Sequence, residues 1–274
     1  MAKNSELNRR DMKMQFCLEA ACGCNTGRIR KKNEDNYYFD SQILPLDNNG
    51  LTIPMYKRFE QDVVCFAVFD GMGGHADGHV ASYLSANVFK HDCEKMEQGG
   101  MLSETFFTRA IVHMNESVCV EAQKLKNNMG STAVIIGFCD DMLYICNVGD
   151  SRAYRYRKNR LLQITMDHVE DIPPFMRSSK RNKPRLSQCI GISPEELTIE
   201  PYVAQGMIKA DDIFLLSSDG LTDMVTEEEI GKILSSGRDA GVCVQMLIDK
   251  ALEHGGRDNV TVIVVRVQEI KETR

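Results

Sequence analysis

The sequence predicts an α+β fold, an αββα sandwich of two mostly antiparallel sheets flanked by helix pairs. The first reason is the order of the predicted elements: strands, two helices, strands, two helices and a last strand. The second is that no internal repeat, linker or low-complexity segment interrupts this order. We therefore expect one domain over residues 16–270, preceded by a flexible leader of residues 1–15.

Composition excludes several classes of protein. The chain has 274 residues, of which 43% are hydrophobic and 26% charged, as in an ordinary soluble globular protein. A net charge of -6 argues against general nucleic-acid binding, which needs a basic face. Several of the 10 cysteines sit in apolar runs, the N-terminal segment is polar throughout, and no apolar run approaches the roughly 20 residues of a membrane span. We expect a cytoplasmic monomer with reduced thiols and no membrane partner.

The first part of the chain is predicted to form strands. Residues 16–24 and 37–39 read as strands, and residues 63–69 are an unbroken apolar run, which is typical of a strand buried on both faces. Residues 41–62 are loop-like, and their Asn-Gly pair at 49–50 is a hairpin signal. That insertion is therefore expected to be an extended hairpin on the surface.

Two helices and a block of strands follow. Apolar residues at helical spacing predict helices over 78–96 and 103–127, the second capped by Ser103. The next strands have the spacing of a meander and cover residues 131–138, 143–148, 152–156 and 161–164.

The last part repeats the pattern. A capping-box pattern predicts a short helix at 193–196, and a buried strand is predicted at 213–218. Thr226 is expected to cap one helix and Asp239 a longer one, which the glycines at 255–256 end. The final strand is predicted over residues 260–265.

Five of the predicted buried strands begin or end at an acidic residue. Asp70 ends the longest apolar run and opens a glycine-rich turn that begins at Gly71. The other acids at strand ends are Glu34, Asp35, Asp150, Asp219 and Asp258. A single Asp-Gly pair is most often a turn, but five charged ends in one domain would repel one another without cations. Hard oxygen ligands of this kind suit Mg²⁺ or Mn²⁺ better than Zn²⁺.

These acids belong to an ordered set of short motifs. The set consists of Arg30-x-x-Asn33-Glu34-Asp35, Asp70-Gly71-Met72-Gly73-Gly74-His75, Gly130-Ser131-Thr132-Ala133, Gly149-Asp150-Ser151-Arg152, Ser218-Asp219-Gly220 and Arg257-Asp258-Asn259. Each motif is weak alone, and the ordered set is specific. Together they resemble the metal-dependent serine/threonine protein phosphatases, the PPM or type 2C family, in its compact bacterial form. The resemblance covers residues 20–267.

The resemblance implies two Mn²⁺ or Mg²⁺ ions at one end of the sheets. It implies that Asp70 bridges both ions and that the carbonyl of Gly71 binds one of them. Asp219 and Asp258 would hold the first ion, and Glu34 would lie at the second.

The resemblance also implies roles in catalysis. Asp35 would orient metal-bound water or its neighbouring ligand, Asp150 matches the acid that recruits a third ion in bacterial relatives, and Arg30 matches the arginine that grips the substrate phosphate. The implied reaction is hydrolysis of phosphoserine and phosphothreonine by direct attack of a metal-bridging water, with no cysteine nucleophile. The implied partners are phosphorylated proteins, among them a serine/threonine kinase that the enzyme opposes.

Three features depart from the family pattern. Met72 stands where many eukaryotic members carry a histidine proposed as general acid, so another group or water is expected to protonate the leaving group. His79 stands where bacterial relatives often have an acid; with His75 it resembles a zinc pair, but the glutamate of HExxH is missing and a packing role is expected. The segment 168–185, where the family's mobile flap lies, is short, proline-containing and basic.

Three other functions stay open. A pseudophosphatase would keep the fold and bind a partner, but its usual mark, the loss of a metal acid, is missing here. A relative specialised for a signalling switch often lacks the arginine that Arg30 supplies. A hydrolase of small phosphate esters would use the same site.

Overall fold

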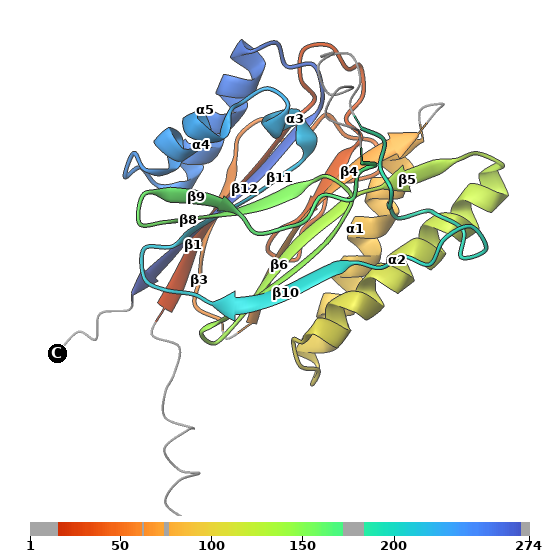
Figure 1. The fold of residues 1–274 in the computed structure, drawn as a ribbon, viewed down its shortest axis with the longest axis horizontal. Coiled ribbons are helices and arrows are strands. Elements are labelled where there is room, and N and C mark those ends of the chain that lie inside the picture. The colour runs from red at the N-terminus through yellow and green to blue at the C-terminus, as the bar shows by residue number, and fades with distance from the viewer. Residues whose placement is uncertain (1–15, 62, 74–76, 172–183, 270–274) are drawn as a thin grey trace, which may run out of the picture.

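The computed structural model describes residues 16–61, 63–73, 77–171 and 184–269. The predicted leader at 1–15 and most of the basic segment, residues 172–183, lie outside the described residues. Two sheets pack against each other, and helices cover their outer faces (Figure 1).

The first sheet is antiparallel throughout and has the strand order β3-β1-β12-β11-β8-β9. Its strands are β3 (Met55–Phe59), β1 (Phe16–Asn25), β12 (Val260–Glu269), β11 (Ile213–Ser217), β8 (Arg152–Arg157) and β9 (Arg160–Gln163). The first and the last strand of the described residues, β1 and β12, are therefore neighbours within one sheet.

The second sheet is also antiparallel, in the order β10-β7-β6-β4-β2, and β5 pairs with the far end of β4. Its strands are β10 (Tyr202–Met207), β7 (Met142–Val148), β6 (Ala133–Cys139), β4 (Val63–Gly73), β2 (Asp35–Tyr38) and β5 (Met129–Ser131). The predicted two-sheet architecture is confirmed.

Strand β4 is buried on both faces, as its apolar run predicts. Phe66 and Val68 point into the core between the sheets, while Ala67 and Phe69 face the helix layer. Phe66 makes ring contacts with Phe39, Phe59 and Phe138 at centroid distances of 5.2 to 6.1 Å. The strand that carries Asp70 is thus fixed by packing from two sides.

The four longer helices in the described part of the chain lie where the sequence predicts them, whereas the single turn of helix at Asp219–Thr222 was not expected. α1 (Gly78–Glu97) and α2 (Glu104–Leu125) cover the second sheet, and α3 (Asp219–Thr222), α4 (Glu227–Leu234) and α5 (Ala240–Glu253) cover the first (Figure 1). The predicted caps form: the side chains of Ser103, Thr226 and Asp239 each accept a hydrogen bond from the first turn of their helix. No helix in the described part of the chain is long and apolar enough to cross a membrane.

Two edge strands are missing from the sequence prediction. Residues 41–62 do not form a separate surface hairpin, because Met55–Phe59 pairs with β1 and Gly50 bridges to Asn25. Strand β10, at the edge of the second sheet, was not expected at all. Both strands pair on one side only and are partly exposed, so their apolar pattern is weak.

Two further expectations are wrong. The predicted meander is divided between the sheets, because the chain crosses from β7 to β8 at residues 149–151, where Gly149 takes φ of +99°. The short helix expected at 193–196 is only a turn, in which the carbonyl of Ser193 accepts from the amides of Glu196 and Leu197. The chain then runs without regular structure until β10 begins at Tyr202.

Candidate metal centre

The register of β2 and β4 places Asp35 directly opposite Asp70. The backbone around Asp70 is fully paired: its amide donates to Oγ1 of Thr132 at 3.1 Å, and its carbonyl accepts from the amide of Thr132 at 2.8 Å. The next amide, that of Gly71, donates to the carbonyl of Glu34 at 3.1 Å. Two of the predicted acidic motifs therefore meet at the same end of one strand pair.

The glycine after Asp70 is required by close backbone contact. A Cβ atom at Gly71 would lie 2.1 Å from the carbonyl oxygen of Gly78, at the start of α1, and 2.5 Å from that of Glu34. No side chain fits there, so the close approach of the three backbone segments requires glycine at this position.

A buried carboxylate connects the two sheets. Oδ2 of Asp35 accepts hydrogen bonds from Oγ of Ser218 at 2.8 Å and from Oγ1 of Thr261 at 2.7 Å. Ser218 immediately precedes Asp219, and the amide of Thr261 donates to Oγ of Ser218 at 3.0 Å. The Asp35 side chain thereby positions the end of β11, where Asp219 lies.

A second link is made by Asn259, next to Asp258. Its Oδ1 accepts from the amide of Glu34 at 2.8 Å, and its Nδ2 donates to the carbonyls of Thr26 and Lys32. The motif is visible in the sequence, but this role is not, because the three partners of the Asn259 side chain lie more than 220 residues away.

Asp150 is joined to the same region through hydroxyl groups. The Oγ1 of Thr132, which receives the Asp70 amide, lies 2.7 Å from Oγ of Ser151, the residue after Asp150. Asp150 itself is buried. All six predicted acids therefore belong to segments that touch one another.

Arg30 lies at the same end of the sheets. Its Nη2 donates to Oδ2 of Asp258 at 2.7 Å, with both side chains partly exposed. This hydrogen bond is the main cause that raises the pKa of Arg30. The predicted phosphate-binding arginine and a predicted metal ligand are thus in direct contact.

Burial and repulsion between carboxylates both act at this site, and burial is the larger cause. Burial raises the pKa of Asp70, and the neighbouring carboxylates of Asp219, Asp35, Asp150 and Asp258 raise it further. Burial also raises the pKa of Glu34. This is the pattern of a site that a cation stabilises.

The pKa of Asp35 is raised in the same way as those of Asp70 and Glu34. Burial raises the pKa of Asp35 to about 7, although the hydrogen bonds from Thr261 and Ser218 lower it; Asp219 and Asp258 add to the rise. A carboxyl group with this pKa carries a proton for part of the time near neutral pH unless a positive charge is bound nearby.

The donor atoms fit a hard divalent cation. They are carboxylate oxygens and the carbonyl of Gly71, the ligand types that Mg²⁺ and Mn²⁺ prefer. Within the described ranges, however, no three Asp, Glu, His or Cys side chains converge closely enough to enclose an ion. The acids lie in one region of the fold, and one of them, Asp258, accepts a hydrogen bond from Arg30.

The predicted histidine pair is only partly described, because His75 lies outside the described residues. His79 is buried at the start of α1, which agrees with the expected packing role. Its Nε2 lies 2.7 Å from Nζ of Lys32, and its Nδ1 has no hydrogen-bond partner among the described residues. The contact with Lys32 was not expected from the sequence.

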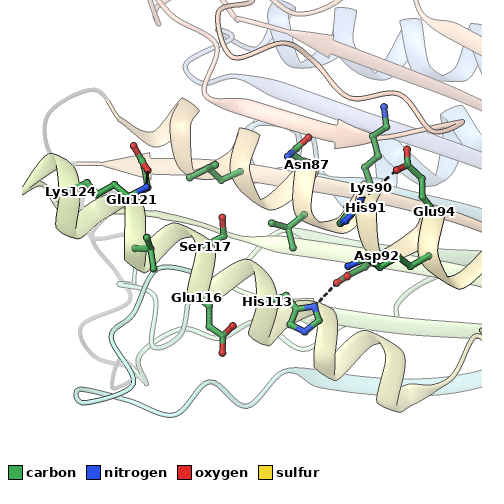
Figure 2. A pocket seen from close by; sticks show the side chains of 14 residues that line it. Asn87, Lys90, His91, Asp92, Glu94, His113, Glu116, Ser117, Glu121 and Lys124 are labelled. Carbon is green, nitrogen blue, oxygen red and sulfur yellow. Dashed lines mark hydrogen bonds and ion pairs between the residues drawn. The ribbon is translucent and has the colours of Figure 1, made fainter.

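A large pocket lies elsewhere. It has a volume of about 770 Å³ between the outer faces of α1 and α2, where Nδ1 of His113 lies 2.9 Å from Oδ2 of Asp92 (Figure 2). Lysines and glutamates of both helices line it, and none of the acidic strand ends does. This pocket is therefore not the predicted centre.

Comparison with known proteins identifies the family. The model of the protein phosphatase 2C family matches residues 30–171. The serine/threonine phosphatase stp of Listeria monocytogenes is 34% identical over 263 residues, which cover 90% of this chain and 95% of that protein. PstP of Mycobacterium tuberculosis is 30% identical, and the match covers 93% of this chain and 46% of PstP.

Solved structures agree. A crystal structure of M. tuberculosis PstP has a TM-score of 0.74 at 28% identity and covers 92% of this chain and 100% of that one. The catalytic domain of PstP in complex with two manganese ions has a TM-score of 0.72 at 27% identity, with coverage of 93% and 100%.

The chain belongs to the protein phosphatase 2C, or PPM, family and resembles its bacterial members. It is a serine/threonine protein phosphatase, a phosphoric monoester hydrolase of a metal-dependent family. Its substrates are therefore phosphoproteins.

We expect Gly71→Ala to lower the free energy of unfolding by about 2 kcal/mol or more, since its Cβ would collide with two backbone carbonyls. Gly231→Ala in α4 is the matched control: a Cβ there meets nothing within 4 Å, so it should stabilise by up to about 1 kcal/mol. Urea unfolding of both variants checks this. Equal stability of the two variants would contradict the close packing at Gly71.

We expect the metal-free protein to lose stability as pH rises from about 4 to 7. The pKa of Asp35 is higher in the folded than in the unfolded chain, so the unfolded chain binds fewer protons in this window and the free energy of unfolding falls with pH. Urea unfolding in EDTA measures it. Asp35→Asn keeps an acceptor for Ser218 and Thr261 and should reduce this loss by on the order of 1 kcal/mol; an unchanged slope would contradict the assignment.

Proposed function

We propose that this phosphatase removes the phosphoryl group in one step, by direct attack of water on phosphorus. The observation that carries the proposal is the gathering of carboxylates around Asp70: burial raises the pKa of Asp70, and the neighbouring acids raise it further. Two bound Mn²⁺ or Mg²⁺ ions would relieve that repulsion, lower the pKa of a water molecule and neutralise charge on the phosphoryl oxygens.

The proposed ligands follow from position in the fold. Asp70 and the carbonyl of Gly71 lie at the end of β4, Asp219 and Asp258 lie at the neighbouring ends of β11 and β12, and Glu34 precedes β2. Two further acids have supporting roles. Asp35 would orient a water or a neighbouring ligand through its fixed carboxylate, and Asp150 would serve a third ion.

Arg30 is proposed to bind the substrate phosphate. A guanidinium group matches the geometry of a phosphate and can donate two parallel hydrogen bonds. Its present partner is Asp258, and about half of its side chain is exposed. Substrate phosphate would compete with, or share, this contact.

A cysteine nucleophile is disfavoured by the environment of Cys24. Cys24 and Arg30 do have the Cys-x5-Arg spacing of tyrosine phosphatases. However, Cys24 is buried in β1, where its Sγ accepts a hydrogen bond from Nδ2 of Asn33 and lies 3.1 Å from Oγ1 of Thr261. Burial and the nearby charge of Asp35 raise its pKa to about 12, so the reactive thiolate is scarce at neutral pH.

The proposed physiological substrates include a serine/threonine kinase. The support is family resemblance alone. The pseudophosphatase alternative is disfavoured because every predicted metal acid is present in one region of the fold.

Hydrolysis of a phosphothreonine peptide tests the proposal. We expect metal-stripped protein to be inactive and Mn²⁺ to restore phosphate release. Asp70→Asn should lower kcat by roughly a thousandfold, because several kcal/mol of charge stabilisation is lost. The matched control is Asp141→Asn, at an exposed turn between β6 and β7, which should behave as wild type. Folded wild-type protein that releases no phosphate with either metal would instead support the phosphopeptide-binding pseudophosphatase.

We expect Arg30→Ala to raise KM for the phosphopeptide by about tenfold or more, since a charge-assisted hydrogen bond contributes about 1.5–3 kcal/mol. The exposed neighbour Arg28→Ala provides the control and should leave KM near the wild-type value. Steady-state kinetics at saturating Mn²⁺ measures both. An unchanged KM for Arg30→Ala would remove its phosphate role.

A further inference from the structure

A second pocket, of about 520 Å³, adjoins the acidic end of β4. It lies between the C-terminal end of α2, strand β5 and the segment 189–196, which run close together in Figure 1. Met72, two residues after Asp70 on β4, forms part of its wall. Nothing in the proposed reaction uses this pocket.

The pocket is within reach of a substrate bound at Asp70. Residues two apart on a strand point to the same face, and the rise of about 3.3 Å per residue puts Met72 roughly 7 Å along the strand from Asp70. An extended peptide with its phosphorylated residue at Asp70 would cover the same distance in about two residues. A side chain two to four residues away would therefore meet the pocket.

The wall of the pocket is apolar and adaptable. It includes Met72 and Met129 together with Cys119, Cys189, Ala122 and Ile192. Thioether and thiol groups are polarisable and unbranched, so they adjust to side chains of different shape. The two thiols stay protonated at neutral pH: burial raises the pKa of Cys189 to about 11, and burial also raises that of Cys119.

The rim of the pocket is polar and carries no excess of one charge. Lys126 and Glu196 have opposite signs, and Gln123, Asn127 and Asn128 add amide groups. Amides at a rim can bind the backbone of an extended peptide, while the apolar wall binds a side chain. Among the described lining residues Lys126 is the only cation, so they offer no positive patch that matches a second phosphate or an acidic cluster.

The floor of the pocket is preformed. Ser131 and Ile190 exchange two backbone hydrogen bonds of 3.0 and 2.8 Å, and the amide of Gly191 donates to Oδ1 of Asn115 at 2.7 Å. A Cβ at Gly130 would lie 2.8 Å from the carbonyl oxygen of Ile190, so the two segments are in close backbone contact. Such a pocket needs little rearrangement to accept a ligand.

We propose that this pocket binds an apolar side chain, such as leucine or methionine, two to four residues from the phosphorylated residue of a substrate protein. The proposal rests on the proposed phosphatase reaction. It assigns sequence preference to residues of α2, β5 and the segment 189–196, separate from the residues that hold the phosphate.

The test uses a panel of phosphothreonine peptides that carry alanine at every neighbouring position, with a single leucine moved through the four positions on either side. We expect leucine at one position between two and four residues away to raise kcat/KM by about tenfold over alanine. Hydrolysis of p-nitrophenyl phosphate, which is too small to reach the pocket, measures the reaction alone.

Ala122→Phe fills the pocket from α2 and should abolish the leucine preference while leaving hydrolysis of p-nitrophenyl phosphate unchanged. Val120→Phe is the matched control, because Val120 is exposed on the same helix and does not line this pocket; it should keep the preference. Ile192→Ser replaces an apolar part of the wall by a smaller polar side chain, so it should weaken the preference without filling the pocket. Thermal unfolding shows that each variant is folded.

A wild-type enzyme with no leucine preference at any position would overturn the proposal, and so would an Ala122→Phe variant that keeps it. If wild-type protein hydrolyses neither p-nitrophenyl phosphate nor any peptide, the proposed reaction fails first. In that case fluorescence anisotropy with labelled versions of the same peptides tests the pocket by itself. Tighter binding of one leucine peptide, lost in Ala122→Phe, would support the proposal, and a Kd that does not depend on leucine would refute it.

Discussion

Repulsion among carboxylates in one partly buried region is the constraint on which this structure depends. Asp70 is surrounded by four other acids, all of which raise its pKa. Such an arrangement is unfavourable in a folded chain unless other groups hold it together. The surrounding hydrogen bonds do this: the Asp70 backbone is paired with Thr132, and the Asp35 carboxylate with two hydroxyls. The folded scaffold thus keeps the carboxylates close together, in an arrangement that favours the binding of a cation.

The sandwich is suited to this purpose because both sheets contribute. Asp35 and Asp70 come from the second sheet, while Ser218 and Thr261, which donate to Asp35, come from the first. The two sheets are held in register by the aromatic cluster around Phe66, at some distance from the acids. Any shift of one sheet against the other would break the Asp35 hydrogen bonds, so packing in the core determines geometry at the site.

The sequence predicts the parts of the fold whose signals are local. The run before Asp70 is apolar without interruption, and Ser103, Thr226 and Asp239 are caps that act within one helical turn. The edge strands β3 and β10 were not predicted. They are strands because each pairs with a neighbouring strand, whereas their own hydrophobic pattern is weak. The same holds at the site. The acids are visible as strand ends, but the hydrogen bonds from the amide of Glu34 to Asn259 and from Thr261 to Asp35 join residues more than 220 positions apart.

Chemistry and recognition are encoded differently along β4. Positions 70 and 71 tolerate few other residues. The Asp70 carboxylate lies among four other acids, and a Cβ at Gly71 would collide with two backbone carbonyls. Met72 meets no such restriction: its flexible side chain packs beside Gly130 and lines a pocket of mixed apolar and amide character. A histidine at this position would place a titratable group in the pocket, whereas methionine makes it a surface for side chains. In the proposed role of this pocket, Met72 contributes to the recognition of substrate side chains, two residues from the acid on which the proposed reaction depends.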